Sequence, residues 1–212
     1  MMETPAKTLL IVYHSWTGST EQMSRAVLRG AAQEPAVTTR LLHARDAGPE
    51  ALLAADGYVF ATPENLAAIS GLMKDFFDRS YYAALDRLNG RPYAALVCAG
   101  SDGSNAARQI ARIATGWRLR EIAPPLVVCT HAQTTEAILA PKVVPAAELA
   151  RGEELVLWFS SDQGGDEDRY YQRVFVTGDP MVDSETADYH AVGLSLLVLD
   201  PHVYDADGQA VT

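Results

Sequence analysis

The sequence predicts an α/β protein in which a five-stranded parallel sheet lies between two layers of helices. Short apolar segments alternate with longer amphipathic segments from residue 7 to about residue 130, and the apolar segments are typical of strands buried on both faces. Strict alternation of strand and helix requires right-handed crossovers, which place helices on both faces of a parallel sheet. The chain of 212 residues is long enough to bury one sizeable core.

Each expected element has a pattern of its own. The strands are apolar runs, beginning with KTLLIVY, and are expected over residues 7–13, 36–44, 57–62, 91–100 and 123–130. The helices place apolar side chains on one face and are expected over residues 19–32, 49–55, 70–85, 104–117 and, shorter than the others, 145–155. The helix over 70–85 has the widest apolar stripe, and Ser70 is placed to cap it.

The alternation ends near residue 156, which divides the chain into a domain over 1–155 and an atypical β-rich extension over 156–212. SSDQGGDEDR, residues 160–169, is polar, acidic and contains glycine, so we expect a linker or mobile loop there. Residues 170–178 and 191–204 have strand character.

Composition excludes several classes of function. A formal net charge of −10 disfavours nucleic acid and anionic membranes as partners. No apolar run is long enough to span a bilayer, and the first residues do not resemble a signal peptide, so we expect a cytoplasmic protein. Cys98 and Cys129 lie in apolar runs and are expected in the core, and the five histidines show no metal-binding spacing.

The turn after the first strand, SWTGST, predicts a phosphate site. Its hydroxyl groups surround Gly18 where a helix is expected to begin, and a helix N-terminus offers free amides and a positive dipole end. Serine and threonine at such a turn are also ordinary helix caps. Two further turns, in TPENLAAIS and CAGSDGS, follow the third and fourth strands and reach the same edge of a parallel sheet, where ligands bind.

SWTGST contains no basic residue, which limits the classes of phosphate ligand that this turn is expected to bind. A nucleotide triphosphatase would have GK[ST], and a dinucleotide-binding fold would have G-x-G-x-x-G in this turn. A response-regulator domain would need acidic residues at the ends of the first and third strands, which end in Tyr13-His14 and Ala61-Thr62. A monophosphate held by amides and hydroxyls remains.

The three turns together resemble those of the flavodoxin-like proteins that bind flavin mononucleotide (FMN). SWTGST is similar to their phosphate loop, and residues 57–79 and 98–117 resemble the second and third flavin loops with their helices in the NAD(P)H-dependent FMN and quinone oxidoreductases. This resemblance implies a three-layer flavodoxin-like fold with strand order 2-1-3-4-5. It also implies that the phosphate is held by Ser15, Trp16, Thr17, Gly18, Ser19 and Thr20. The isoalloxazine ring would be lined by Thr62, Pro63, Glu64 and Asn65, and its pyrimidine side closed by Cys98, Ala99, Gly100, Ser101, Asp102 and Gly103.

Residues of these turns also have simpler interpretations. Trp16 is either a wall of the flavin site or a core residue, and Glu64 is expected to be a solvated residue at the rim. His14 adjoins the site and is expected to point into the sheet.

The resemblance leaves an enzyme, an electron carrier and a non-catalytic subunit open. A carrier commonly shields its flavin with aromatic side chains from the second and third loops, whereas PENLAAIS and AGSDGS contain none. This favours an NAD(P)H-dependent FMN oxidoreductase that reduces a quinone-like or other small organic acceptor, in which FMN performs the chemistry and no catalytic side chain is required. The extension has too few apolar residues for a core of its own, so it should lie on an edge of its own sheet, on the sheet face left by the short last helix, or on a second subunit. Of these we expect a homodimer in which the extension contributes to the interface, and the alternative is an appendage on a monomer.

Overall fold

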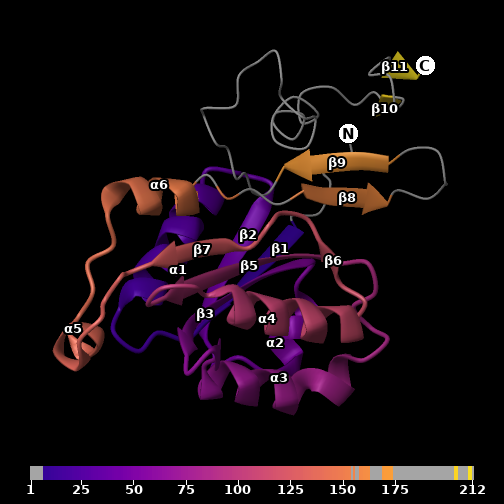
Figure 1. The fold of residues 1–212 in the computed structure, drawn as a ribbon. Coiled ribbons are helices and arrows are strands. Elements are labelled where there is room, and N and C mark those ends of the chain that lie inside the picture. Colours follow the sequence, from indigo (N-terminus) through magenta and orange to yellow (C-terminus); the bar gives the residue numbers. More distant parts are fainter. Residues whose placement is uncertain are drawn as a thin grey trace.

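The computed structural model describes residues 7–153, 155, 158–162, 169–173, 203–204 and 210–211. A parallel sheet of the order β2-β1-β3-β5 forms its centre (Figure 1), made of β2 (Val37–His43), β1 (Lys7–Tyr13), β3 (Gly57–Asn65) and β5 (Pro92–Ala99). The far edge of β5 pairs with β6 (Arg120–Glu121) and further along with β7 (Leu126–Cys129). The predicted strand order 2-1-3-4-5 is therefore confirmed, with the fifth strand broken into two pieces.

Helices cover both faces of this sheet, as predicted. The helices α1 (Ser19–Ala31) and α6 (Ala146–Glu153) lie on one face, and α2 (Pro49–Ala54), α3 (Gly71–Ala84) and α4 (Ser104–Gly116) lie on the other (Figure 1). Successive side chains of a strand point to opposite faces. Leu9 and Ile11 accordingly join the core beneath α1, whereas Leu10 and Val12 join the core beneath α3 and α4.

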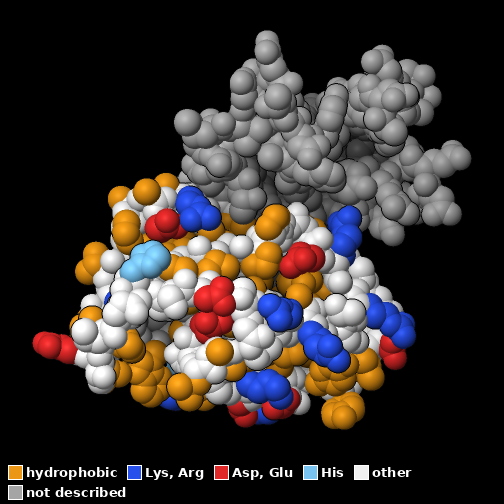
Figure 2. Space-filling view, viewed as in Figure 1, with side chains coloured by type: hydrophobic (Ala, Val, Ile, Leu, Met, Phe, Trp, Pro, Cys, Tyr) orange, Lys and Arg blue, Asp and Glu red, His pale blue; other side chains and the backbone are white. Residues whose placement is uncertain are grey.

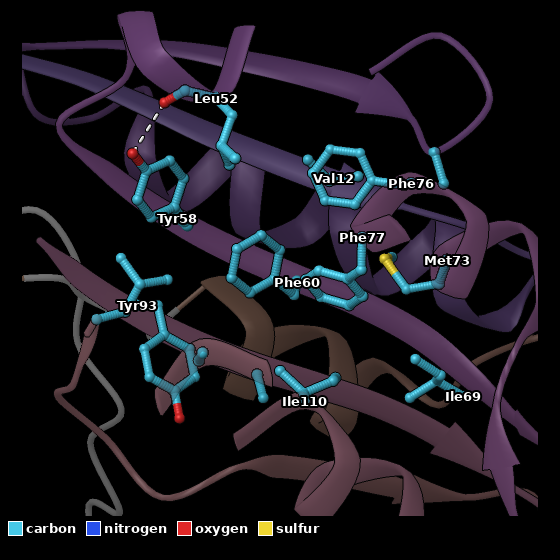
Figure 3. Close-up of a cluster of buried hydrophobic side chains, with 14 of the residues drawn as sticks. Val12, Leu52, Tyr58, Phe60, Ile69, Met73, Phe76, Phe77, Tyr93 and Ile110 are labelled. Atoms are coloured by element: carbon cyan, nitrogen blue, oxygen red, sulfur yellow. Dashed lines mark hydrogen bonds between the residues drawn. The ribbon is translucent and has the colours of Figure 1, made fainter. Parts of the chain in front are cut away.

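Aromatic side chains fill the core beneath α3 and α4. Phe60 lies between Tyr58 and Phe77 (Figure 3), with ring centroids 5.7 Å and 5.1 Å away, and the buried Trp117 lies 5.5 Å from Phe77. The Tyr58 hydroxyl donates to the Leu52 carbonyl at 2.8 Å, so this buried polar group has a partner. On the outer surface of these helices, acidic and basic side chains are interspersed (Figure 2).

The helix α6 lies directly against α1 through two glycines. A Cβ on Gly30 would lie 2.1 Å from the Glu153 carbonyl oxygen, and a Cβ on Gly152 would lie 3.0 Å from Met23 Cε. Arg29 also forms an ion pair with Glu153, with 2.7 Å between nitrogen and oxygen. The short helix α6 thus covers the same face of the sheet as α1.

Two short elements differ from the prediction. The strand β3 continues to Asn65 and turns back into β4 (Ala68–Ile69), and a small helix, α5 (Thr135–Leu139), follows β7. The turn between β3 and β4 places Leu66 and Ala67 at φ values of 52° and 56°. Glycine and asparagine usually occupy such positions, so the sequence carried no signal for this hairpin.

In the extension, β8 (Trp158–Asp162) pairs antiparallel with β9 (Arg169–Arg173), and β10 (Val203–Tyr204) pairs with β11 (Ala210–Val211). The expectation of a linker over 160–169 is therefore wrong at its two ends, because Ser160–Asp162 belongs to β8 and Arg169 begins β9. The strands expected over 174–178 and 191–202 lie outside the described residues. Among the described helices, none is both long and apolar enough to cross a membrane.

Candidate functional site

The three predicted loops follow adjacent strands and meet at one edge of the sheet. The strands β1, β3 and β5 are neighbours, with Tyr13 in register with Ala61 and Pro63 in register with Cys98. The structure therefore brings the loops over 14–18, 64–67 and 100–103 side by side at the carboxyl ends of the strands, which is where open α/β sheets bind ligands.

The first loop presents the beginning of α1 without a side-chain cap. Gly18 is the N-cap in the left-handed conformation, at φ 95°, and among the described residues no side chain accepts a hydrogen bond from the amides of residues 19–21 that follow it. The Ser15 hydroxyl accepts from the Gly18 amide at 3.1 Å and so shapes the loop. The interpretation of these hydroxyls as ordinary caps is therefore wrong for this helix.

The other long helices differ from α1 in this respect. The Ser70 hydroxyl accepts from Met73 N at the start of α3, and Glu64 accepts from the first turn of α4. Free amides at a helix N-terminus, together with the helix dipole, favour a bound anion. The acidic residue in the first turn of α1, Glu21, is paired with Arg25 at 2.8 Å. This arrangement fits a phosphate held without a basic side chain.

A segment distant in sequence supports the first loop. Lys142 N donates to the Thr17 carbonyl at 2.8 Å, and the Gln22 amide donates to the Lys142 carbonyl at 2.6 Å and accepts from Val144 N at 3.1 Å. The Lys142 ammonium donates to the Ile138 carbonyl of α5 at 3.0 Å and to the Ala140 carbonyl directly after α5 at 2.7 Å. Sequence reasoning missed this contact because Gln22 and Lys142 are 120 positions apart and neither lies in a motif.

Ser19 and Thr20, the first residues of α1, are buried beside the third loop. The fully buried Thr20 hydroxyl faces the Cys98 thiol and has no other polar partner among the described residues. Burial raises the pKa of Cys98 to about 11, and the hydroxyls of Thr20 and Ser19 act in the opposite direction. Cys98 is thus a neutral core thiol beneath the loop, as the sequence predicted, and both cysteines are free.

The second loop is fixed from below by Thr62. The Thr62 hydroxyl is fully buried, accepts from Ser70 N at 3.1 Å and donates to the Pro63 carbonyl at 3.0 Å. The groups of this loop that face solvent are therefore those beyond Pro63. Asn65 is exposed, and Leu66 is fully exposed at the tip of the hairpin.

Glu64 is not the solvated rim residue that the sequence suggested. Its side chain is half-buried, and its two carboxylate oxygens accept from Gly103 N and Ala106 N, each at 3.1 Å. In the third loop, Ala99 and Gly103 are buried, and Gly100, Ser101 and Asp102 are exposed. The sequence could not indicate this contact because Glu64 and Gly103 lie 39 positions apart.

Trp16 and His14 flank the first loop. Trp16 keeps 69% of its surface exposed, so the interpretation as a core residue is wrong. His14 is buried, with its ring centroid 6.4 Å from that of Trp16 and 5.5 Å from that of His43, and its Nδ1 has no partner among the described residues. Burial lowers the pKa of His14, and the nearby His43 and Arg45 lower it further.

Comparisons with known proteins indicate which class of protein this chain resembles. Residues 47–134 match the family described as NADPH-dependent FMN reductase. A flavodoxin from Aquifex aeolicus is 37% identical over 70 residues, 33% of this chain and 38% of the relative. An NAD(P)H dehydrogenase (quinone) from Acidithiobacillus ferrooxidans is 32% identical over 92 residues, 34% of this chain and 46% of the relative. The chain thus spans less than half the length of either relative.

Solved structures show the same fold. An archaeal flavodoxin covers 69% of this chain, and 91% of its own length, at a TM-score of 0.57 and 19% identity. Rubredoxin oxygen:oxidoreductase from Desulfovibrio gigas covers 71% of this chain, and 34% of its own length, at a TM-score of 0.56 and 17% identity. The fold is flavodoxin-like. The resemblance to flavodoxin-like FMN-binding proteins is confirmed by the fold and by the matched family, whose description names FMN.

Proposed function

We propose that this chain is an FMN-dependent oxidoreductase that passes reducing equivalents from NAD(P)H through bound FMN to a quinone-like or other small organic acceptor. The observation that carries the proposal is the open first turn of α1, beside the half-buried residues Ser15 and Thr17 and next to two further loops at the same sheet edge. The matched family and the quinone dehydrogenase relative support the same class of reaction.

In this proposal the protein supplies binding and orientation. The amides after Gly18 hold the phosphate, and the hydroxyls of the first loop complete its hydrogen bonds. The outer parts of the second and third loops, at Glu64 and Asn65 and at residues 100–102, flank the ring, and the buried residues of both loops support them from below. The bound FMN supplies the redox chemistry, so the site needs no side-chain acid or nucleophile.

The exposed surface of the two ring loops favours an enzyme over a carrier. Neither loop contains an aromatic side chain, so the ring face beside them stays accessible to a nicotinamide and then to an acceptor. The second candidate is a flavodoxin-type carrier, which the flavodoxin relative and the exposed Trp16 beside the first loop support. A non-catalytic flavodoxin-like subunit is the third.

Two measurements on the purified protein test the proposal. Titration with FMN should give a saturable complex with a flavin absorbance spectrum. Under anaerobic conditions, NADH or NADPH should bleach that spectrum and a quinone should restore it. A chain without FMN affinity contradicts the whole proposal, whereas a flavin that only a partner reductase reduces identifies the carrier.

A further inference from the structure

The helix α4 begins in the same way as α1, but a carboxylate already accepts hydrogen bonds from its N-terminus. Both helices follow a strand at the same sheet edge and start at a left-handed glycine, with φ 95° at Gly18 and φ 80° at Gly103. At α4, the Glu64 carboxylate occupies the first turn through Gly103 N and Ala106 N, each at 3.1 Å. Such charge-assisted hydrogen bonds are stronger than those between neutral groups.

The acceptor comes from a different loop, so the contact joins two parts of the candidate site. Glu64 is on β3, directly before the left-handed turn at Leu66 and Ala67. Two neutral side chains of α4 hold the same hairpin, because Asn105 donates to the Ala67 carbonyl and Gln109 accepts from Ile69 N at 3.2 Å. Of these three contacts only that of Glu64 carries a charge.

The start of α4 is itself fixed. A Cβ on Gly103 would lie 2.7 Å from Val127 Cγ1 and 3.1 Å from Ala99 Cβ, so Gly103 sits against β5 and β7 with no room to shift. A carboxylate bound to this rigid point therefore sets where the strained second loop lies relative to the third.

We propose that Glu64 is a positioning residue with two effects: it fixes the second flavin loop against the third, and it neutralises the N-terminus of α4. The second effect rests on the proposed function. A free helix N-terminus favours negative charge nearby, and flavin gains negative charge on reduction, so an uncompensated α4 would favour the reduced cofactor. Glu64 thus compensates the N-terminus of α4, whereas the N-terminus of α1 stays open for the phosphate.

Glu64→Gln tests both effects, with Glu50→Gln as the matched control, because Glu50 is an exposed carboxylate in the first turn of α2 at the same sheet edge. In the protein without flavin, we expect amide hydrogen exchange at Gly103 and Ala106 to accelerate about tenfold in Glu64→Gln, as expected when a hydrogen bond to a charged group is weakened. With FMN, we expect the ratio of the dissociation constants for oxidised and reduced flavin to rise about tenfold, which for a two-electron couple is about 30 mV toward positive potential.

Different outcomes of these measurements would contradict the positioning role and the electrostatic role of Glu64. Unchanged exchange at both amides in Glu64→Gln, or the same change in Glu50→Gln, rejects the positioning role, and this readout does not depend on flavin. Weaker FMN binding with an unchanged ratio of dissociation constants rejects the electrostatic role. Glu64→Asp keeps the charge on a shorter side chain, so it should restore the wild-type ratio even if the loop moves. Failure of wild type to bind FMN refutes the proposed function and leaves the exchange test of Glu64 valid.

Discussion

Gly18 determines how open the first turn of α1 is to an anion. Its left-handed backbone, at φ 95°, directs the chain into the helix while no side chain of the loop reaches the first-turn amides. An ideal Cβ there would have only Gln22 Nε2, at 3.6 Å, and the Lys142 carbonyl, at 3.9 Å, as neighbours, so a substitution meets strain rather than a clash. Asparagine and aspartate tolerate this conformation better than other residues with a Cβ.

A pair of isosteric substitutions separates charge from shape at this position. We expect Gly18→Asp to weaken FMN binding by about 2 kcal/mol more than Gly18→Asn, because a carboxylate within a few ångströms repels the phosphate. Both variants should unfold at similar denaturant concentrations. Titration by flavin fluorescence measures the difference, and equal affinities would place the phosphate elsewhere.

His14 predicts a pH dependence of stability. Burial lowers its pKa in the folded protein, with His43 and Arg45 adding to the effect, so below the ordinary histidine pKa the unfolded chain binds a proton that the folded protein excludes. The free energy of unfolding should therefore decrease as the pH falls from about 7 toward 5, and His14 should contribute no slope above that window.

The measurement is denaturant unfolding of wild type and His14→Phe between pH 5 and 8. Phenylalanine keeps a ring against Trp16 and His43 but cannot bind a proton. The free energy of unfolding of this variant should therefore depend less on pH than that of wild type. The exposed His131, at φ 53°, supplies the control His131→Asn, which should leave the profile unchanged. An identical slope in all three proteins would mean that other groups set the acid sensitivity.

At the scale of elements, the periodicity of apolar residues was enough to predict a helix or strand wherever that element buries a whole face. The helix over 104–117 was predicted to within one residue because Ala107, Ile110 and Ala114 share its buried side. The hairpin β3–β4 was missed because its left-handed turn is made of Leu66 and Ala67 and is held by contacts from α4. Likewise, the loop positions of the site followed from sequence, whereas the roles of Glu64 and Gln22 depend on partners far along the chain.

The contact between α1 and α6 gives a prediction at this scale. Alanine is normally the better helix former by about 1 kcal/mol. At Gly30, however, its Cβ would lie 2.1 Å from the Glu153 carbonyl oxygen, so we expect Gly30→Ala to displace α6 and to lower the free energy of unfolding by about 1–3 kcal/mol. Gly71→Ala, at a position of α3 with nothing within 4 Å, should have no such cost. Urea denaturation compares the two, and a Gly30→Ala protein as stable as wild type would show that α6 contributes little.

For the whole molecule, one feature of the topology brings the site together. The loops come from β1, β3 and β5, which are adjacent in space although two helices separate β1 from β3 in sequence and one helix separates β3 from β5. Parallel strands end at one edge, so a sequence that alternates strand and helix already places these turns together. The fold thereby combines an open helix N-terminus at α1 with a compensated one at α4.

The extension after residue 155 gives the prediction for the assembly. Leu155 is buried in the core with Val144 and Met23, so a chain ending at Leu155 keeps that core complete. The pair β8 and β9 is a two-stranded sheet, and in the part of the chain that the structure describes these strands pair only with each other. An isolated two-stranded hairpin is marginally stable in water, so we expect it to pack on a second copy of the chain.

Truncation after Leu155 tests this expectation. The full chain should be a homodimer by light scattering, and the truncated chain should be a folded monomer at the same protein concentration, because an interface built on the extension is lost with it. FMN binding should persist in the truncated chain, since all three loops and the segment at Lys142 that supports the first loop lie before residue 155. A truncated protein that binds FMN and keeps the mass of the full chain would exclude the extension from the interface, and a full chain that is already monomeric would exclude the dimer.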